Sequence, residues 1–143
     1  NALQNAKLDY DYVIMDCAPS LSMLTVNALV ATDGVIIPMQ CEYFALEGIA
    51  DLIDTIEKLT QINPKLHIRG VVRTMYDGRS TLAQDVSTEL ENYFGEKLYK
   101  TVIPRSIRLA EAPSFGKSIF EYEKSSKGAI AYHQLMKEVL GQP

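Results

Sequence analysis

Short apolar runs alternate with amphipathic segments along the chain. Four runs are rich in β-branched residues, are bounded by turn residues and predict strands. They cover residues 12–16, 34–40, 68–75 and 100–105. Their apolar residues are nearly continuous, which is typical of strands that are buried on both faces of a parallel sheet. Four other segments place apolar residues three and four positions apart and predict helices. They cover residues 20–31, 42–59, 81–94 and 126–140.

Residues that favour helix ends support these boundaries. Ser20 follows Pro19 and is the expected N-cap of the first helix. Gly95 and Gly141 are natural C-terminal stops for the last two helices. The stretch "IPRSIRLAEAPSFGKS", residues 103–118, is expected to form a long loop after the fourth strand, and long loops in compact domains are often functional.

The order of strands and helices predicts an α/β fold with a doubly wound, mostly parallel sheet between two layers of helices. A length of 143 residues suits a single domain, 1–143, with one core. Ligands of such sheets bind beyond the carboxyl ends of the strands. Four stretches therefore become candidates for the site, namely 16–20, 38–48, 74–80 and 104–118.

Composition removes several classes of function. The chain is 47% hydrophobic and 22% charged, has no apolar stretch long enough to cross a membrane, and begins without signal-peptide character. His67 and His133 have no partner at metal-ligand spacing, and Ser20 lacks the glycine-flanked elbow of a hydrolase nucleophile. Cys17 and Cys41 are expected to be reduced core thiols of a cytoplasmic protein.

Charge is distributed unevenly. The net charge is −4, yet residues 97–127 hold seven basic and three acidic side chains. This basic segment predicts either a surface that binds phosphate or nucleic acid, or an ordinary solvated face, and charge alone leaves both open.

Asp16 stands where the first predicted strand ends. A buried carboxylate without a partner is costly, so it needs a cation, backbone donors or water. In phosphate-binding α/β proteins this position often orders Mg²⁺, usually through a water, although an aspartate that only caps the next helix fits as well.

Four stretches taken together resemble the ParA/Soj chromosome- and plasmid-partitioning ATPases, of the deviant-Walker P-loop class that includes MinD. They are "YDYVIMDCAPSLSMLTVNAL", "GVIIPMQCEYFALEGIADL", "GVVRTMYDGRSTLAQDV" and "TVIPRSIRLAEAPSFGKSI". They occur in order, and the similarity runs from about residue 10 to residue 140. The resemblance implies a three-layer P-loop NTPase fold, ATP and Mg²⁺ as cofactors, and a role in chromosome partitioning or plasmid segregation.

The resemblance also implies a role for individual residues. Asp16 matches the Walker B aspartate that orders Mg²⁺ through water, and Asp16, Pro19 and Ser20 belong to switch II. The residues implied to lie against the nucleotide base are Thr74, Met75, Pro104, Arg105 and Ser106. The residues implied to bind DNA non-specifically in the ATP-bound homodimer are Arg79 and Arg108, with Lys117, Lys124 and Lys127 as an extension. The implied partners are non-specific DNA and a ParB-type centromere-binding protein, at the nucleoid in the cytoplasm.

One departure limits the resemblance. The family's Gly-rich loop, Lys-Gly-Gly-x-Gly-Lys-Thr, is absent, and Gly34 is the first glycine. We therefore expect a C-terminal portion of a ParA domain, incomplete at its N-terminal side, that has no catalytic residue of its own and hydrolyses no ATP alone, since phosphoryl transfer depends on that loop. Strand 12–16 would then have an open edge, which predicts self-association or poor solubility.

Two alternatives remain at this stage. The first is a MinD-like cell-division ATPase recruited to a membrane. The last predicted helix argues against it, because that helix lacks a basic amphipathic face. The second is a non-catalytic α/β module that shares only the fold.

Overall fold

The structure, a computed structural model, describes residues 9–18, 20–43 and 47–141. Its elements follow in the order α2 (Met23–Ala31), β1 (Gly34–Gln40), α3 (Glu47–Leu59), β2 (His67–Tyr76), α4 (Thr81–Phe94), η1 (Gly95–Lys97), β3 (Leu98–Pro104), α5 (Ile107–Glu111), η2 (Ala112–Phe115), α6 (Ile119–Tyr122) and α7 (Lys127–Gly141). The strands form one sheet in the order β1-β2-β3, and β2 pairs with β3 in parallel. The predicted α/β class is therefore confirmed.

The chain packs as two units. One consists of residues 1–35 and 48–69, and the other of residues 36–47 and 70–143. The first unit contains α2, most of α3 and the first residues of β1 and β2. In it, the Asn63 side chain after α3 donates hydrogen bonds to the carbonyls of Leu29 (3.3 Å) and Thr32 (2.6 Å), which joins the end of α3 to the end of α2.

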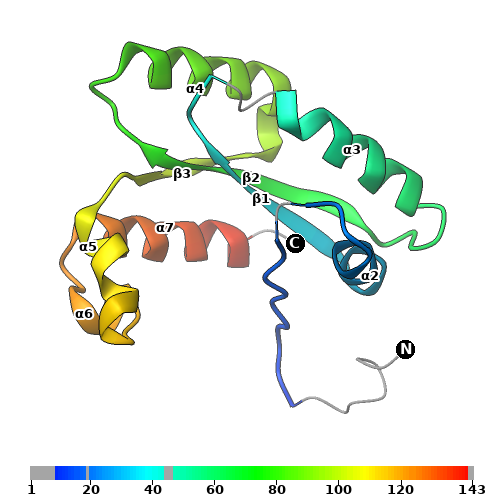
Figure 1. Ribbon diagram of the computed structural model, residues 1–143, viewed down its shortest axis with the longest axis horizontal. Helices are drawn as coiled ribbons and strands as arrows, with labels where there is room; N and C mark the ends of the chain where they lie inside the picture. The colour runs from blue at the N-terminus through cyan, green and yellow to red at the C-terminus, as the bar shows by residue number, and fades with distance from the viewer. Residues whose placement is uncertain (1–8, 19, 44–46, 142–143) are drawn as a thin grey trace. The chain divides into compact units, whose positions relative to one another are not determined.

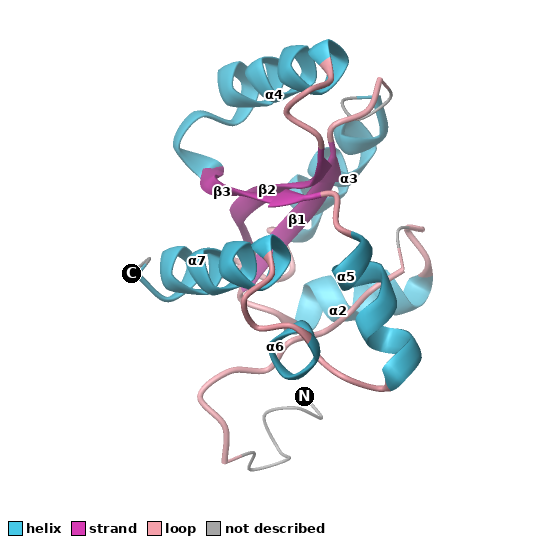
Figure 2. Cartoon of the chain, turned by 90° about the vertical axis from the view of Figure 1, so that its left-hand side faces the viewer, coloured by secondary structure: helices cyan, strands magenta, loops and turns pink. Residues whose placement is uncertain are grey.

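The second unit has three layers. Helix α4 covers one side of β2 and β3, and α7 lies on the other (Figures 1 and 2). The core between the sheet and α7 consists of Val72, Tyr99, Ile103 and Ala131. A smaller cluster of Ala112, Ile119 and Ala129 joins α7 to η2 and α6. This core keeps the start of α7 close to the end of β3.

The predicted C-terminal end of α4 at Gly95 is confirmed, whereas Gly141 is the last residue of α7 rather than a stop beyond it. Ser80 caps α4 by accepting a hydrogen bond from Ala83 N, and Gly95 ends it with φ +52°, where glycine has no steric penalty. The N-cap of α2 differs from the prediction. Ser22 rather than Ser20 accepts the bond from Thr25 N at 3.4 Å, so α2 begins at Met23.

Two predictions about local structure are wrong. Residues 12–16 form no strand, and Tyr12, Val13 and Ile14 are exposed, because no neighbouring strand pairs with them in the described residues. The predicted long loop after β3 is instead folded into α5, η2 and α6. These pieces are too short for a periodic signal and depend on packing against α7.

The two cysteines also differ. Cys41 is buried as expected, and burial raises the pKa of its thiol, whereas Cys17 is exposed.

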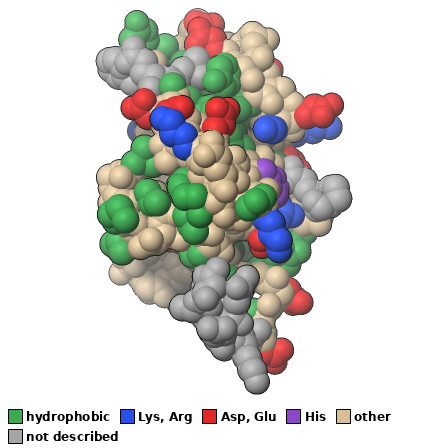
Figure 3. Space-filling view, turned by 90° about the vertical axis from the view of Figure 1, so that its right-hand side faces the viewer, with side chains coloured by type: hydrophobic (Ala, Val, Ile, Leu, Met, Phe, Trp, Pro, Cys, Tyr) green, Lys and Arg blue, Asp and Glu red, His purple; other side chains and the backbone are tan. Residues whose placement is uncertain are grey.

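Several apolar side chains of the first unit are at the surface, including Tyr10, Ile14, Met23 and Leu24. One face of the molecule carries several groups of hydrophobic side chains (Figure 3).

Candidate functional site

The carboxyl ends of the three strands are tied together within the second unit. Thr74 Oγ1 of β2 donates to the carbonyl of Met39 in β1 at 3.2 Å. The backbone N–H of Arg105, just after β3, donates to the carbonyl of Tyr76 in β2 at 3.0 Å. These bonds place the predicted base-binding residues of two strands at one edge of the sheet, where α/β proteins bind ligands.

Met75 lies at this edge in an unusual backbone conformation. Its φ is +53°, a left-handed value that a side chain with a Cβ rarely adopts. The register of β2 with β3 shifts between Arg73 and Tyr76, so Met75 lies at an irregularity of the ladder, which resumes with the pairing of Tyr76 and Pro104. Strain of this kind is concentrated at binding sites, and the role of Met75 beside a base stays a prediction.

Arg105 is the charged residue of this edge. Its guanidinium lies 3.6 Å from the Glu42 carboxylate, which follows β1, and both side chains are more than half exposed. An exposed pair at this distance is weak, so Arg105 is free to turn toward a ligand. Pro104 and Ser106, the other two residues predicted to contact the base, flank it, and Ser106 is the N-cap residue of α5 without a side-chain capping bond.

Arg79 is held by its neighbour Asp77. Its Nε and Nη2 donate to the two carboxylate oxygens at 3.0 and 2.8 Å, while its side chain stays 91% exposed. The hydrogen bonds from Arg79 lower the pKa of Asp77 to about 2. The guanidinium is therefore presented to solvent in a fixed orientation, with part of its charge compensated.

Arg108 is held in a similar way. Its Nη1 donates to Glu111 Oε2 at 3.0 Å, and the Tyr122 hydroxyl donates to the same oxygen at 3.1 Å. The Tyr122 ring stacks on Phe115, with centroids 5.1 Å apart. The hydrogen bond to Glu111 raises the pKa of Arg108 above its ordinary value. None of these partners was apparent from the sequence, because the helices that carry them were not predicted.

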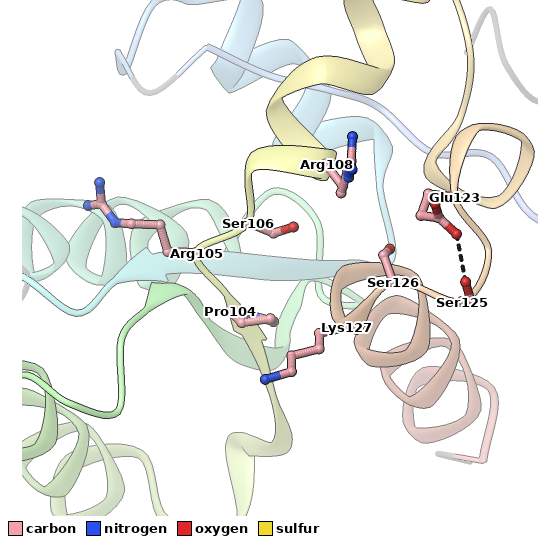
Figure 4. Close-up of a pocket in the computed structure, with 8 residues that line it drawn as sticks. All are labelled: Pro104, Arg105, Ser106, Arg108, Glu123, Ser125, Ser126 and Lys127. Carbon is pink, nitrogen blue, oxygen red and sulfur yellow. Dashed lines mark hydrogen bonds between the residues drawn. The ribbon is translucent and has the colours of Figure 1, made fainter.

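The three predicted DNA-contacting lysines do not lie in equivalent places. Lys117, Lys124 and Lys127 are all exposed. Only Lys127 lines a cavity of about 390 Å³. The cavity is also lined by Pro104, Arg105, Ser106, Arg108, Glu123, Ser125 and Ser126 (Figure 4). It therefore joins residues that the resemblance implies for the base with residues that it implies for DNA.

The switch II residues are less constrained. Asp16 and Ser20 are exposed in the first unit, and Pro19 lies outside the described residues. Contrary to the expectation above, Asp16 does not end a buried strand, because residues 12–16 pair with no strand in the part of the chain that the structure describes. Its carboxylate is accessible and suits a water-mediated contact to Mg²⁺. Within residues 9–18, 20–43 and 47–141, no three His, Cys, Asp or Glu side chains gather as metal ligands, and no helix is long and apolar enough to cross a membrane.

Comparisons with known proteins give the family of the chain. A family model described as "AAA domain" matches residues 1–68. The chromosome-partitioning ATPase Soj of Thermus thermophilus is 52% identical over 99% of this chain, which covers 58% of Soj. The chromosome partitioning protein ParA of Caulobacter vibrioides is 49% identical over 93% of this chain, which covers 50% of ParA. This chain thus spans about half the length of these curated relatives.

The same fold is present in solved structures. A structure of cobyrinic acid a,c-diamide synthase from Mycobacterium smegmatis matches 97% of this chain with a TM-score of 0.77 and 36% identity, over 50% of that protein. A second structure of that enzyme contains bound ADP and magnesium. The fold thus defines an α/β protein of the P-loop NTPase class. Within that class, the chain belongs to the ParA/Soj family of partitioning ATPases.

Proposed function

We propose that this chain is the part of a ParA-type ATPase that contacts the nucleotide base and carries the DNA-binding face. The complete ATPase would drive chromosome or plasmid partitioning through ATP-dependent dimerisation and non-specific DNA binding, and a ParB-type protein would stimulate its hydrolysis. The observation that carries the proposal is the 52% identity to a chromosome-partitioning Soj over nearly the whole chain. The strand-end cluster supports it independently, because it joins Thr74, Met75 and Arg105 where this fold binds ligands.

The base would lie against the edge formed by β2 and β3. Met75 and Pro104 supply apolar surface, and Thr74 and Ser106 supply hydroxyl groups beside it. Bound Mg²⁺ supplies charge neutralisation for the phosphates, and Asp16 is the residue that would hold its water. We propose that the 143-residue chain alone does not hydrolyse ATP, because this reaction needs backbone amides and a lysine around the phosphates that the family takes from its Gly-rich loop.

A chimera tests the proposal directly. This chain replaces the matching segment of Thermus thermophilus Soj, and the product is called the Soj chimera below. We expect ATP hydrolysis, measured by phosphate release, and ATP-dependent binding to a fluorescent DNA duplex that weakens steeply with salt. Loss of both activities in a folded chimera would overturn the proposal.

Two controls separate the alternatives. Flotation with anionic liposomes would reveal a MinD-like membrane activity, for which we expect no ATP-dependent signal. The isolated chain should release no phosphate above background, and measurable turnover by it would contradict the proposed dependence on a Gly-rich loop. A chimera that binds ATP but neither DNA nor membrane would point to an unrelated function of the fold.

A further inference from the structure

Strand β3 uses more residues than β2 over the first part of their pairing. Val71 of β2 pairs with Leu98. Two residues further along β2, Arg73 pairs with Val102, which is four residues further along β3. The extra residues form a bulge over residues 99–101, called the β3 bulge below. A bulge leaves backbone groups outside the ladder, and such groups need other partners.

Two charged side chains bind the backbone of the β3 bulge. Arg73 Nη2 donates to the carbonyls of Tyr99 at 3.1 Å and Lys100 at 3.3 Å. The two carboxylate oxygens of Glu138 accept hydrogen bonds from the N–H groups of Lys100 and Thr101, each at 2.9 Å. Glu138 Oε1 also accepts a hydrogen bond from the Thr101 hydroxyl. Each of these bonds has one charged partner, and such bonds are stronger than neutral ones.

The two charges come from opposite layers of the second unit. Arg73 is itself held by Ser87 and Glu91 of α4, to which its Nη1 donates at 2.7 and 2.6 Å. Its side chain is only 8% exposed, so the protein rather than water surrounds the guanidinium. Glu138 lies on α7, which covers the other side of the sheet (Figure 2). The β3 bulge is therefore held between α4 and α7.

The β3 bulge affects the register at the strand ends, where the predicted base-binding residues lie. A regular parallel ladder continued from the Val71 pair would bring Pro104 opposite Asp77. With the bulge, Pro104 pairs with Tyr76, and Met75 lies at the second irregularity with φ +53°. The two irregularities together move Pro104 by one residue relative to β2 and place it beside the turn at Met75. Bulges are known to re-aim side chains next to binding sites in this way.

We propose that Arg73 and Glu138 are positioning residues of the nucleotide site. They act through the β3 bulge, which ends three residues before Pro104 and sets where Pro104 lies relative to Met75. The inference rests on the proposed function and deepens it, because it names the residues outside the site that keep the base contact in register.

A comparison of two ligands isolates the expected effect. A slip in register removes the contact between Pro104 and the base, but it leaves the phosphates on the Gly-rich loop. ADP and inorganic pyrophosphate share two phosphates and differ by the nucleoside. Isothermal titration calorimetry of the Soj chimera with Mg²⁺ gives both dissociation constants. The Kd of pyrophosphate divided by the Kd of ADP is called the nucleoside preference below.

Two substitutions loosen the β3 bulge, one from each layer. Glu138→Gln keeps one acceptor oxygen and turns an amide N–H toward a backbone N–H. Arg73→Lys keeps the charge but loses the planar fork that reaches two carbonyls. We expect each to lower the nucleoside preference about 10-fold, because a displaced contact no longer binds well, and to leave the Kd of pyrophosphate within about 2-fold.

Two matched controls separate positioning from charge and from stability. Glu89→Gln removes an exposed carboxylate of α4 and should leave the nucleoside preference within about 2-fold. Val86→Ala removes buried methyl groups, which donate and accept no hydrogen bonds, and should lower the melting temperature without changing the preference. Thermal melting checks that each variant folds. If one of the two bulge variants does not fold, the other still tests the same contact network from the opposite layer.

The outcomes are distinguishable. If ADP and pyrophosphate bind the unsubstituted chimera equally well while Soj itself prefers ADP, the proposed base contact is wrong and the inference fails with it. If the chimera prefers ADP but Glu138→Gln and Arg73→Lys behave like Glu89→Gln, the positioning role is wrong and the proposed function stands. An equal loss of preference in Val86→Ala would also overturn the inference, because the preference would then follow stability alone.

Discussion

Two similar segments of this chain have different structures. Residues 12–16, "YVIMD", and residues 101–105, "TVIPR", are both short apolar runs that end in a charge and precede a helix. The second lies at the end of strand β3, next to β2 and covered by α7. The first pairs with no strand in the described residues and is exposed, so that Ile14 is 92% accessible while Ile103 is 3% accessible.

The difference shows that a strand depends on its neighbours more than on its own residues. β-branched residues favour extended backbone, but the gain comes from cross-strand pairing and from burial of the side chains. Strand β3 has both. The side of β3 toward α7 is covered as well, since the Glu138 carboxylate accepts hydrogen bonds from the backbone N–H groups of Lys100 and Thr101, each at 2.9 Å.

Truncation of the two segments gives the largest expected contrast. Ile103→Ala leaves a cavity in the core between the sheet and α7 and should lower the free energy of unfolding by about 3 kcal/mol. Ile14→Ala removes a side chain that is already in water and should change it by less than about 0.5 kcal/mol. Urea denaturation of both variants measures the difference. Equal losses would show that residues 12–16 pack as a strand in solution.

Arg73 of β2 joins β3 to α4, and its replacement should give the second-largest loss of stability. Its Nη1 donates to Ser87 Oγ (2.7 Å) and to Glu91 Oε1 (2.6 Å) on α4, and its Nη2 donates to the carbonyl of Tyr99 (3.1 Å) on β3. The Arg73 side chain is buried, so Arg73→Ala removes these hydrogen bonds and leaves a cavity where the guanidinium was. We expect a loss of about 2–3 kcal/mol in the free energy of unfolding.

A lysine at position 73 is the matched control for that measurement. Arg73→Lys keeps the charge but has one donor group in place of a planar fork, so it should recover only part of the loss. Full recovery would indicate that charge alone matters at this position, and no loss in Arg73→Ala would indicate that the network contributes nothing to stability.

Glu138 gives β3 a second source of stability that residues 12–16 lack, because it accepts hydrogen bonds from the backbone of β3. Glu138→Ala exposes the backbone N–H groups of Lys100 and Thr101 and should cost about 1–2 kcal/mol. It also opens the edge of an apolar strand, which should promote association between chains. Urea denaturation measures the first effect and light scattering the second. Glu138→Gln retains one acceptor oxygen and should lie between the two. An unchanged association state in Glu138→Ala would mean that α7 itself protects the edge.

Asp77 directly follows β2, and its pairing with Arg79 should give the smallest effect, a change in how stability depends on pH. Its folded pKa of about 2 lies below the ordinary aspartate value of 3.8, so the pairing with Arg79 stabilises the fold above pH 3.8 and this contribution is lost as the pH falls toward 2. A ¹³C NMR titration of the Asp77 carboxyl should show the low value in the native chain. In Arg79→Gln the pKa should return toward 3.8. A value that does not move would show that Arg79 is not its partner in solution.

Much of the candidate site could be predicted because it lies on long, periodic elements. Thr74, Met75 and Pro104 were placed correctly at strand ends from the apolar runs that precede them. The contacts of Glu111, Tyr122 and Ser126 were missed. Glu111 and Tyr122 lie on α5 and α6, which are too short for a periodic signal, and Ser126 lies just before α7, whose start was predicted but whose packing was not. The small-residue pair Ser126-Gly128 was the available clue, since it resembles a capped helix start with close packing.

The sequence by itself determined the α/β class, the bounds of β1 and α4 and the family, because these depend on local periodicity and on four motifs in order. Only the tertiary structure decided that residues 12–16 are not a strand. The residues of one segment do not show whether another strand lies beside it to pair with. The tertiary structure also decided which of three similar lysines lies in a cavity, because only packing brings residues 104–108 and 123–127 together.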